Sequence, residues 1–450
     1  MMDSNDIVVG LDIGTVNITA VIGECDTDRN GEPVLKVVGV GNVPSEGIRN
    51  GVIMNKEAAS ACIVQAVEDA VNMSGRDVEE VVCGISGEHV KGLNSIGVVK
   101  VDSRRRGEKP EITEQNKQEA MRSAGAIPEV PDRETFFVMP IEYKVNNQGG
   151  IKNPLHMIGN RLEVQAHIIT ASTSAMKNLK NCIDRSEYGI LNMVPITLAD
   201  SKAVLIPEEE KTGVMVIDIG GGTTEVGIQM NGATYFTGVV PIGGKYVTSD
   251  IATVLKLSGD IAEKIKVNRG VCHEQLVGAD ETIEIPVTSG TFGERNVSRL
   301  RVCEIAKARM WEIFSKVKRA VEDAKVMQYV NSGIVLTGGG ALLPGVSEVA
   351  EEVFKIPVRI GDPIGFTVDI EKDGKKIDGD IYKNPKYAGA IGLAQIGLDM
   401  KTRAQIEKNR KKSDKGMSSP DDIPTDGGDG FLKKVGKWAW GKTKSFVQDF

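Results

Sequence analysis

VVGLDIGTVNITAVIG at residues 8–23 and VMVIDIGGGTTEVGIQ at residues 214–229 are the two stretches that decide the fold. Each contains an apolar strand, the triplet Asp-Ile-Gly, a turn of small residues and a second strand that returns. A single Asp-x-Gly turn would be an ordinary hairpin, but two copies in matching strand context are hard to attribute to chance. The partial repeat therefore predicts two lobes of related architecture.

The turns in both copies are suited to binding phosphate. Asp12 and Asp218 end the first strand of each copy, and the residues after them are mostly Gly and Thr. Without bulky side chains, backbone N–H groups can approach phosphate oxygens. The carboxylates suit Mg²⁺, which usually keeps several waters, so we expect Asp12 and Asp218 to hold the ion through water. The candidate phosphate-binding residues are Gly14, Thr15, Asn17, Gly220, Gly221, Gly222, Thr223 and Thr224.

A third glycine turn lies in GIVLTGGGALLPG at residues 333–345. Here an apolar strand leads into Gly338, Gly339 and Gly340. A glycine triplet lets a flat adenine ring or a phosphate lie against the backbone. Together the three turns predict a site for ATP.

Composition and patterning set the class of protein. Up to about residue 400, short apolar strands alternate with helical patterns, which is typical of an α/β fold. The net charge of −7 and the absence of a basic reading module argue against nucleic acid as a partner. The N-terminus does not resemble a secretory signal, and no stretch is long and apolar enough to span a bilayer. We therefore expect a cytoplasmic body.

The last fifty residues have a different composition. A basic run and the stretch SSPDDIPTDGGDG predict a flexible linker over residues 401–430. Residues 431–450 predict an amphipathic helix that lies in the interface of an anionic membrane, although a helix docked on a partner or on the body is the alternative. GKWAWGKT at 436–443 matches the Walker A pattern but lacks its strand-and-helix context. The candidate membrane residues are Phe431, Leu432, Lys433, Lys434, Val435, Lys437, Trp438, Trp440 and Phe446.

The three turns in this order resemble the two phosphate motifs and the adenosine motif of the actin-like superfamily. LADSKAVLI (198–206) and PKYAGAIGLAQIGL (385–398) look like its two connecting helices. Within the superfamily the chain is most similar to the FtsA family of bacterial cell-division proteins. The resemblance rests on EGIRNGVIMNKEAASACIVQAVEDA near the start, GIKNPLHMIGNRLEVQAHIIT at 150–170, DIGGGTTEVGI, and IAEKIKVNRG at 261–270.

This resemblance implies an actin-like, duplicated ribonuclease-H-like fold with two lobes, a nucleotide cleft, small inserted subdomains and a C-terminal amphipathic helix. The implied parts are the first lobe (1–85 and 166–200, subdomain 1A), an inserted subdomain 1C (86–165), the second lobe (201–230 and 301–383, subdomain 2A), its small subdomain 2B (231–300), a return helix (384–400), the linker (401–430) and the membrane-targeting helix (431–450).

The resemblance also implies a function. Proteins of this family bind ATP, self-associate and tether filaments of the tubulin-like FtsZ, through its C-terminal peptide, to the cytoplasmic face of the membrane at the division septum, where they recruit other division proteins. It places Glu263 and Lys266 beside the adenosine, although a solvated helix face would explain the same pair. A pilus-assembly adaptor or a sugar or acyl kinase of the same superfamily remains the alternative.

Glu225 is the candidate catalytic residue. It follows the second turn, where related ATPases place a group that orients the attacking water. A side chain that simply faces solvent is the equal alternative. Because no base for a second substrate is evident, whether the chain is an enzyme stays open, with weak ATP hydrolysis at most.

Overall fold

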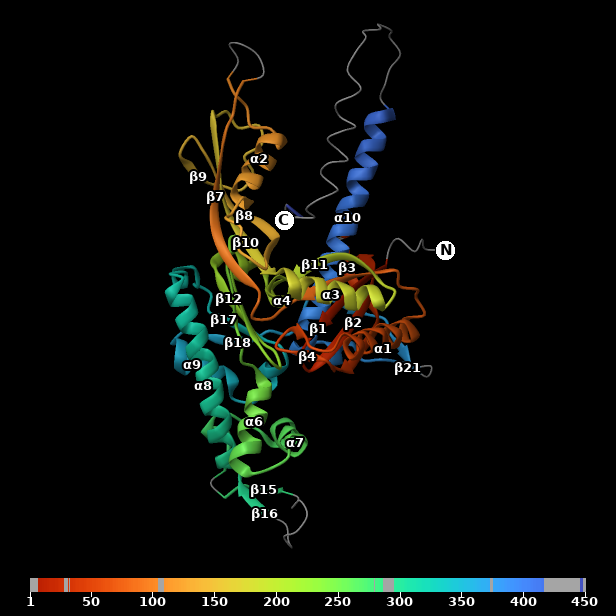
Figure 1. The fold of residues 1–450 in the computed structure, drawn as a ribbon, viewed down its shortest axis with the longest axis vertical. Helices are drawn as coiled ribbons and strands as arrows, with labels where there is room; N and C mark the ends of the chain where they lie inside the picture. The colour runs from red at the N-terminus through yellow and green to blue at the C-terminus, as the bar shows by residue number, and fades with distance from the viewer. Residues whose placement is uncertain are drawn as a thin grey trace.

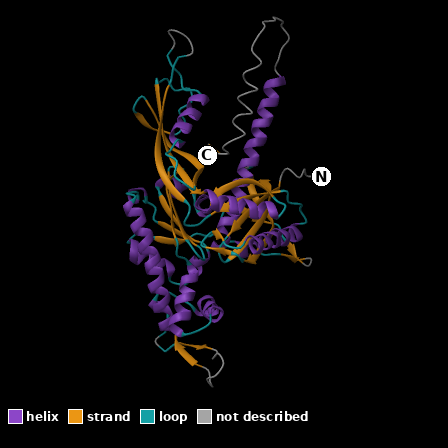
Figure 2. Cartoon of the chain, in the orientation of Figure 1, coloured by secondary structure: helices purple, strands orange, loops and turns teal. Residues whose placement is uncertain are grey.

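The computed structural model describes residues 7–27, 31, 33–103, 109–278, 280–285, 295–372, 375–416 and 446–447. Its centre consists of sheets, and most helices lie outside them (Figure 2). The first lobe contains a six-stranded sheet with strand order β11-β6-β1-β2-β3-β19. Its strands are β1 (Ile7–Ile13), β2 (Asn17–Thr27), β3 (Pro33–Pro44), β6 (Glu80–Ile85), β11 (Gly189–Pro195) and β19 (Phe366–Val368).

The second lobe repeats the central part of this sheet. Its order is β14-β13-β12-β17-β18, with an antiparallel hairpin β12–β13 in the place of β1–β2. In both lobes a parallel strand borders the hairpin. The structure therefore has the two related halves that the sequence repeat predicted. The strands are β12 (Val214–Ile219), β13 (Thr224–Met230), β14 (Ala233–Val240), β17 (Ile334–Thr337) and β18 (Val358–Ile360).

A third sheet is inserted into the first lobe. Its order is β22-β8-β10-β7, and β9 pairs with β8. α2 (Glu114–Gly125) packs on it so closely that a Cβ on Gly97 would lie 2.0 Å from the carbonyl oxygen of Ala120. The strands are β7 (Lys91–Lys100), β8 (Arg133–Val145), β9 (Gln148–Ile151), β10 (Arg161–Ser172) and β22 (Phe446–Val447).

Helices cover both faces of the first sheet. α1 (Lys56–Ser74) begins at Asn55, whose side chain accepts hydrogen bonds from the backbone N–H groups of Glu57 and Ala58, and it ends at Gly75, which has the left-handed backbone common at helix ends. α3 (Thr173–Arg185) lies beside it. The apolar side chains between these helices and the sheet form one core cluster.

Two helices lie between the lobes. α4 (Ile196–Val204) packs on β12 and β13, α10 (Ala388–Gly416) packs on β1 and β2, and the two helices pack on each other. Their contact needs glycine, because a Cβ on Gly392 would lie 1.8 Å from the carbonyl oxygen of Ala199. Because α4 and α10 pack on each other, the β1–β2 and β12–β13 hairpins, which carry the two Asp-Ile-Gly turns, are held next to each other.

The small subdomain of the second lobe lies at the opposite end of the molecule from α2 (Figure 1). It contains α6 (Gly244–Leu255), α7 (Gly259–Arg269) and the hairpin of β15 (Thr282–Ile285) and β16 (Arg295–Ser298). α8 (Arg299–Asp323) packs on α6 and on α9 (Val346–Phe354). Besides short 3-10 helices, the described residues also form β4 (Ile48–Arg49), β5 (Val52–Ile53), α5 (Pro207–Thr212), β20 (Glu371–Lys372) and β21 (Lys375–Lys376).

Two sequence predictions about the C-terminal part need correction. α10 continues through Gly416, so residues 401–416 belong to a helix and not to the flexible linker predicted for 401–430. This segment consists mostly of Lys, Arg, Gln, Glu and Ala, which favour helix, and contains no Gly or Pro before Gly416. In Figure 1 the helix projects away from the lobes. Within the described part of the chain, no helix is long and apolar enough to span a membrane.

The second correction concerns the conformation of Phe446, which was predicted to be helical on a membrane and is extended in this structure, while its contact with a membrane stays a prediction. Phe446 and Val447 instead form the short strand β22, parallel to Phe137 and Val138 of β8. Among the described strands, β9 pairs with β8 only near Tyr143, so the edge at Phe137 is open to an extended segment. The other candidate membrane residues, from Phe431 to Trp440, lie outside the described residues.

Candidate functional site

The first turn joins β1 to β2 and is held by its own backbone. The N–H of Gly14 donates to the carbonyl of Asn17, at 3.0 Å. The hydroxyl of Thr15 accepts a hydrogen bond from the N–H of Gly51, at 3.3 Å, which fixes the turn against the next loop. The side chain of Asn17 is exposed. In this structure Asn17 therefore supports the turn through its carbonyl group.

The second turn joins β12 to β13 and is fixed by the start of α6. The carbonyl oxygens of Gly220 and Gly221 accept hydrogen bonds from the N–H groups of Gly244 and Lys245, both at 2.8 Å. The buried hydroxyl of Thr224 donates to the carbonyl of Ile242, at 2.8 Å. The small subdomain is thus bonded directly to this turn.

The two turns touch each other across the lobes. A Cβ on Gly221 would lie 2.1 Å from Cγ2 of Val16, and a Cβ on Gly222 would lie 2.8 Å from Oγ1 of Thr15. Only glycine permits this approach, because real Cβ atoms do not come so close to other atoms. The structure thereby brings together the two sets of residues that the sequence repeat singled out.

The third turn lies beside the second. Gly338 has a φ of +81°, and a Cβ on it would lie 1.8 Å from Oδ1 of Asp218. A Cβ on Gly340 would lie 2.3 Å from Cγ2 of Ile219. Gly339, by contrast, is exposed and has open space where its side chain would be. Of the triplet, Gly339 is the residue whose lack of a side chain is not required by packing within the protein.

Four carboxyl groups surround these turns. Burial raises the pKa of Asp12 to about 6. Burial, helped by the nearby Asp12, raises the pKa of Glu225 to about 7. The pKa values of Asp218 and Asp200 are also raised, first by burial and then by the neighbouring carboxylates. Burial and mutual repulsion both disfavour the charged forms, so this cluster favours protons or a cation.

Asp200 was not among the sequence-predicted site residues. It lies on α4, is 1% exposed, and its Oδ2 has no hydrogen-bond partner among the described residues. A buried polar atom without a partner is costly. The sequence signal was present, since Asp200 is an acidic residue inside the otherwise mostly apolar stretch LADSKAVLI.

Glu225 does not face solvent, so that alternative is wrong. Its side chain is 2% exposed, and Oε1 accepts a hydrogen bond from the N–H of Gly87, at 3.3 Å, where the chain enters the inserted subdomain. It also lines a small cavity with Ser86, Thr197 and Thr237. Its role in orienting water stays a prediction.

Glu263 and Lys266 lie on α7 and face α6. They form an ion pair of 2.8 Å, and the ammonium of Lys266 also donates to the carbonyl of Gly244, at 3.3 Å, and to the hydroxyl of Thr248, at 3.0 Å. Glu263 accepts a hydrogen bond from the same hydroxyl. The pair is therefore packed against Gly244, whose N–H donates to the second turn.

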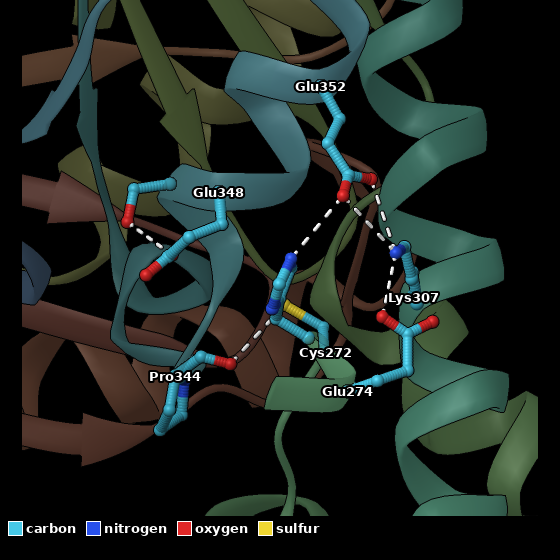
Figure 3. Close-up of polar contacts among 8 residues, drawn as sticks. Cys272, Glu274, Lys307, Pro344, Glu348 and Glu352 are labelled. Carbon is cyan, nitrogen blue, oxygen red and sulfur yellow. Dashed lines mark hydrogen bonds and ion pairs between the residues drawn. The ribbon is translucent and has the colours of Figure 1, made fainter. Parts of the chain in front are cut away.

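A polar cluster joins the loop after α7 to α8 and α9. Figure 3 shows Lys307 of α8 between Glu274 and Glu352, at 2.8 and 3.2 Å. His273 contacts Glu352, at 3.3 Å, and the buried thiol of Cys272 donates to the carbonyl of Pro344. Burial raises the pKa of this thiol, which makes it a packing group and not a nucleophile. The cluster helps to hold α7 in place.

Two further residues at the site were missed. Lys245 follows the Gly243–Gly244 pair, and its ammonium donates to the carbonyl of Thr15, at 3.0 Å, on the other lobe. Gly389, near the start of α10, lies against Asp12, since a Cβ there would be 3.0 Å from Oδ2. Both depend on contacts between segments far apart in the chain, which local patterns do not show.

The repeated hairpin sheets, the interlobe helices and the facing turns define a protein of the actin-like fold. Solved structures share it: the PilM–PilN type IV pilus biogenesis complex (TM-score 0.61, 17% identical, covering 87% of this chain and 98% of that one) and Spiroplasma citri MreB5 (TM-score 0.51, 14% identical, covering 89% and 99%). At these identities the likeness concerns the fold alone.

Sequence comparison gives the family. The family model "Cell division protein FtsA" matches residues 215–392, and "SHS2 domain inserted in FTSA" matches residues 87–170. The cell division protein FtsA of Borreliella burgdorferi is 38% identical over 410 residues, which cover 91% of this chain and 95% of that protein. The chain belongs to the FtsA family of cell-division proteins. This membership removes the kinase and pilus-adaptor alternatives.

Proposed function

We propose that the chain binds ATP with Mg²⁺ between its lobes. The contact of two Gly/Thr turns from opposite lobes, beside Asp12 and Asp218, carries this proposal. The residues fit the ion, because buried carboxyls with raised pKa values and an unpartnered Oδ2 on Asp200 favour a nearby cation. Asp12 and Asp218 would hold Mg²⁺ through water, and the ion would neutralise phosphate charge. The Spiroplasma citri MreB5 structure, which shares the fold, is bound to ADP.

The third turn and α7 would bind the nucleoside. Gly339, which follows the Gly338 that packs on Asp218, is exposed with open space at its Cβ position, and Glu263 and Lys266 are held against α6 next to the second turn. Glu225 would orient a water toward the terminal phosphate from its buried position. Since the residues supply mainly positioning, we propose slow hydrolysis at most, with ATP acting as an assembly switch.

The cellular role follows from the family and the C-terminal segment. We propose that the chain self-associates and tethers FtsZ filaments, through the FtsZ C-terminal peptide, to the cytoplasmic face of the membrane at the septum, where it recruits other division proteins. Residues 431–450 combine aromatic side chains with five lysines, which suits an anionic membrane surface. A polymer of such chains would bind firmly even if each anchor is weak.

The strand β22 adds a condition to membrane binding. Phe446 pairs with Phe137 of β8 in the structure, so an anchor that includes Phe446 must leave β8 before it enters lipid. Two residues of strand pairing are a small cost compared with burial of several aromatic side chains. Lipid would therefore compete successfully for this segment.

Co-sedimentation with anionic liposomes tests the role. The full chain with ATP should bring FtsZ to the liposomes, and a chain ending at Gly430 should not. Trp438→Glu should abolish binding, whereas Gln448→Glu, which adds the same charge on the lysine side of the predicted helix, should weaken it only slightly. Recruitment of FtsZ by the truncated chain would contradict the tethering role.

A further inference from the structure

Lys245 bonds both phosphate turns at once. Its backbone N–H donates to the carbonyl of Gly221 in the second turn, at 2.8 Å. Its ammonium donates to the carbonyl of Thr15 in the first turn, at 3.0 Å. Lys245 is the second residue of α6, so this one side chain links the small subdomain of the second lobe to the first lobe.

The charge balance of the site favours a positive side chain there in addition to the proposed Mg²⁺. Asp12, Asp200, Asp218 and Glu225 surround the turns, and a nucleoside triphosphate would add several negative charges. The two turn sequences, GTVN at 14–17 and GGGTT at 220–224, contain no Lys or Arg. A polyphosphate there would meet backbone N–H groups but no positive side chain of the turns.

Lys245 is free to supply that charge, whereas Lys266 is not. Lys266 forms an ion pair with Glu263, at 2.8 Å. Lys245 has no ion pair with a carboxylate among the described residues, and its bond is to a neutral carbonyl. An ammonium bonds a phosphate oxygen more strongly than it bonds a neutral carbonyl, because both partners are charged. A phosphate at the first turn would therefore take Lys245 from Thr15.

We propose that Lys245 is the phosphate-binding cation of this site and that it recognises the β- and γ-phosphates of a nucleoside polyphosphate. The inference rests on the proposed ATP binding. When its ammonium bonds phosphate oxygens near Thr15, the start of α6 and the second turn are held toward the first lobe. Lys245 thus binds the ligand and closes the two lobes on it.

The test measures binding of ATP, ADP and AMP, with Mg²⁺, to the full chain and three variants. Lys245→Met removes the charge but keeps much of the length of the side chain, and Lys245→Arg keeps the charge. Lys264→Met is the matched control, because Lys264 is an exposed lysine on α7. Thermal unfolding of each unliganded variant checks that it folds.

Lys245→Met should weaken ATP binding by roughly ten- to hundred-fold, the usual value of a charge-assisted hydrogen bond, and AMP binding by less than about two-fold. Lys245→Arg should restore most of the ATP affinity, and Lys264→Met should bind like the wild type. The ATP affinity of Lys245→Met should also depend less on salt concentration.

Equal weakening of ATP and AMP by Lys245→Met, or no weakening at all, would overturn the assignment while ATP binding by the wild type still stood. If the wild-type chain bound none of the three nucleotides, the proposed function would fail and this inference with it. The two failures are therefore distinguishable in the same titration.

Discussion

Glu225→Gln should stabilise the unliganded protein at pH 8 and change its stability little at pH 5. The carboxyl of Glu225 is 2% exposed, and its pKa rises from 4.5 to about 7 on folding. The folded state therefore holds a proton that the unfolded state has released between these two pH values. The contribution of Glu225 to stability is therefore fully present below about pH 4.5 and is lost as the pH rises through about 7.

The magnitude follows from the two pKa values. At 1.36 kcal/mol per pH unit, the ionised Glu225 costs about 3 kcal/mol at pH 8 and under about 1 kcal/mol at pH 5. Glutamine keeps the oxygen that accepts the N–H of Gly87 and carries no charge. The expected gain at pH 8 is at most about 3 kcal/mol, because the added amide N–H₂ also needs a partner.

Urea unfolding at both pH values measures this difference. In a chain ending at Gly430, Trp311 on α8 is the one remaining tryptophan, so its fluorescence reports the lobe that contains Glu225. Glu79→Gln, an exposed position, is the control and should change stability by less than about 0.5 kcal/mol at either pH. A Glu225→Gln variant that is less stable than the wild type at pH 8 would refute the reasoning.

Three other predictions use the same structure. Asp200→Asn should also raise the urea midpoint at pH 8, because burial and nearby carboxylates raise the pKa of Asp200. An unchanged midpoint would argue against a raised pKa for this carboxyl. Gly338→Ala should lower the thermal midpoint strongly and abolish ATP binding, since its Cβ would lie 1.8 Å from Oδ1 of Asp218, whereas Gly339→Ala, whose Cβ would meet no protein atom, should leave the thermal midpoint unchanged and weaken ATP binding. Thr237→Val should cost about 1–3 kcal/mol of unfolding free energy, because it removes the hydroxyl that bonds the buried Nε2 of His167, at 2.9 Å; Thr212→Val, at an exposed position, is the control.

The hairpin turns could be predicted because their sequence signal is local. Asp12 and Asp218 each end a short apolar strand and precede small residues, and the structure forms β1–β2 and β12–β13 at these places. The duplicated fold followed from the match between the two stretches. The part of the site made by strand, turn and returning strand was thus readable from the chain.

The rest of the site depends on contacts between distant segments. Asp200 reaches the cluster because α4 lies between the lobes, and Lys245 reaches Thr15 only when the lobes face each other. No periodicity within α4 or α6 contains that information. The helix end at Gly416 was missed for another reason: a charged, polar composition was interpreted as linker although its helix propensity is high.

The glycines of the three turns have two different causes, and the sequence alone could not separate them. Gly221, Gly222 and Gly338 are required by the protein itself, because a side chain would collide with Val16, Thr15 or Asp218. A Cβ on Gly339 would meet no protein atom within 4 Å, so packing within the protein does not require glycine at this position. Gly221 and Gly222 determine how closely the two lobes approach each other, and Gly338 determines how closely the third turn approaches Asp218. The close approach of the lobes is what allows Lys245 to reach Thr15. Gly221 and Gly222 are therefore a condition for closing the two lobes, and Gly338 is a condition for packing the third turn against Asp218 within the second lobe.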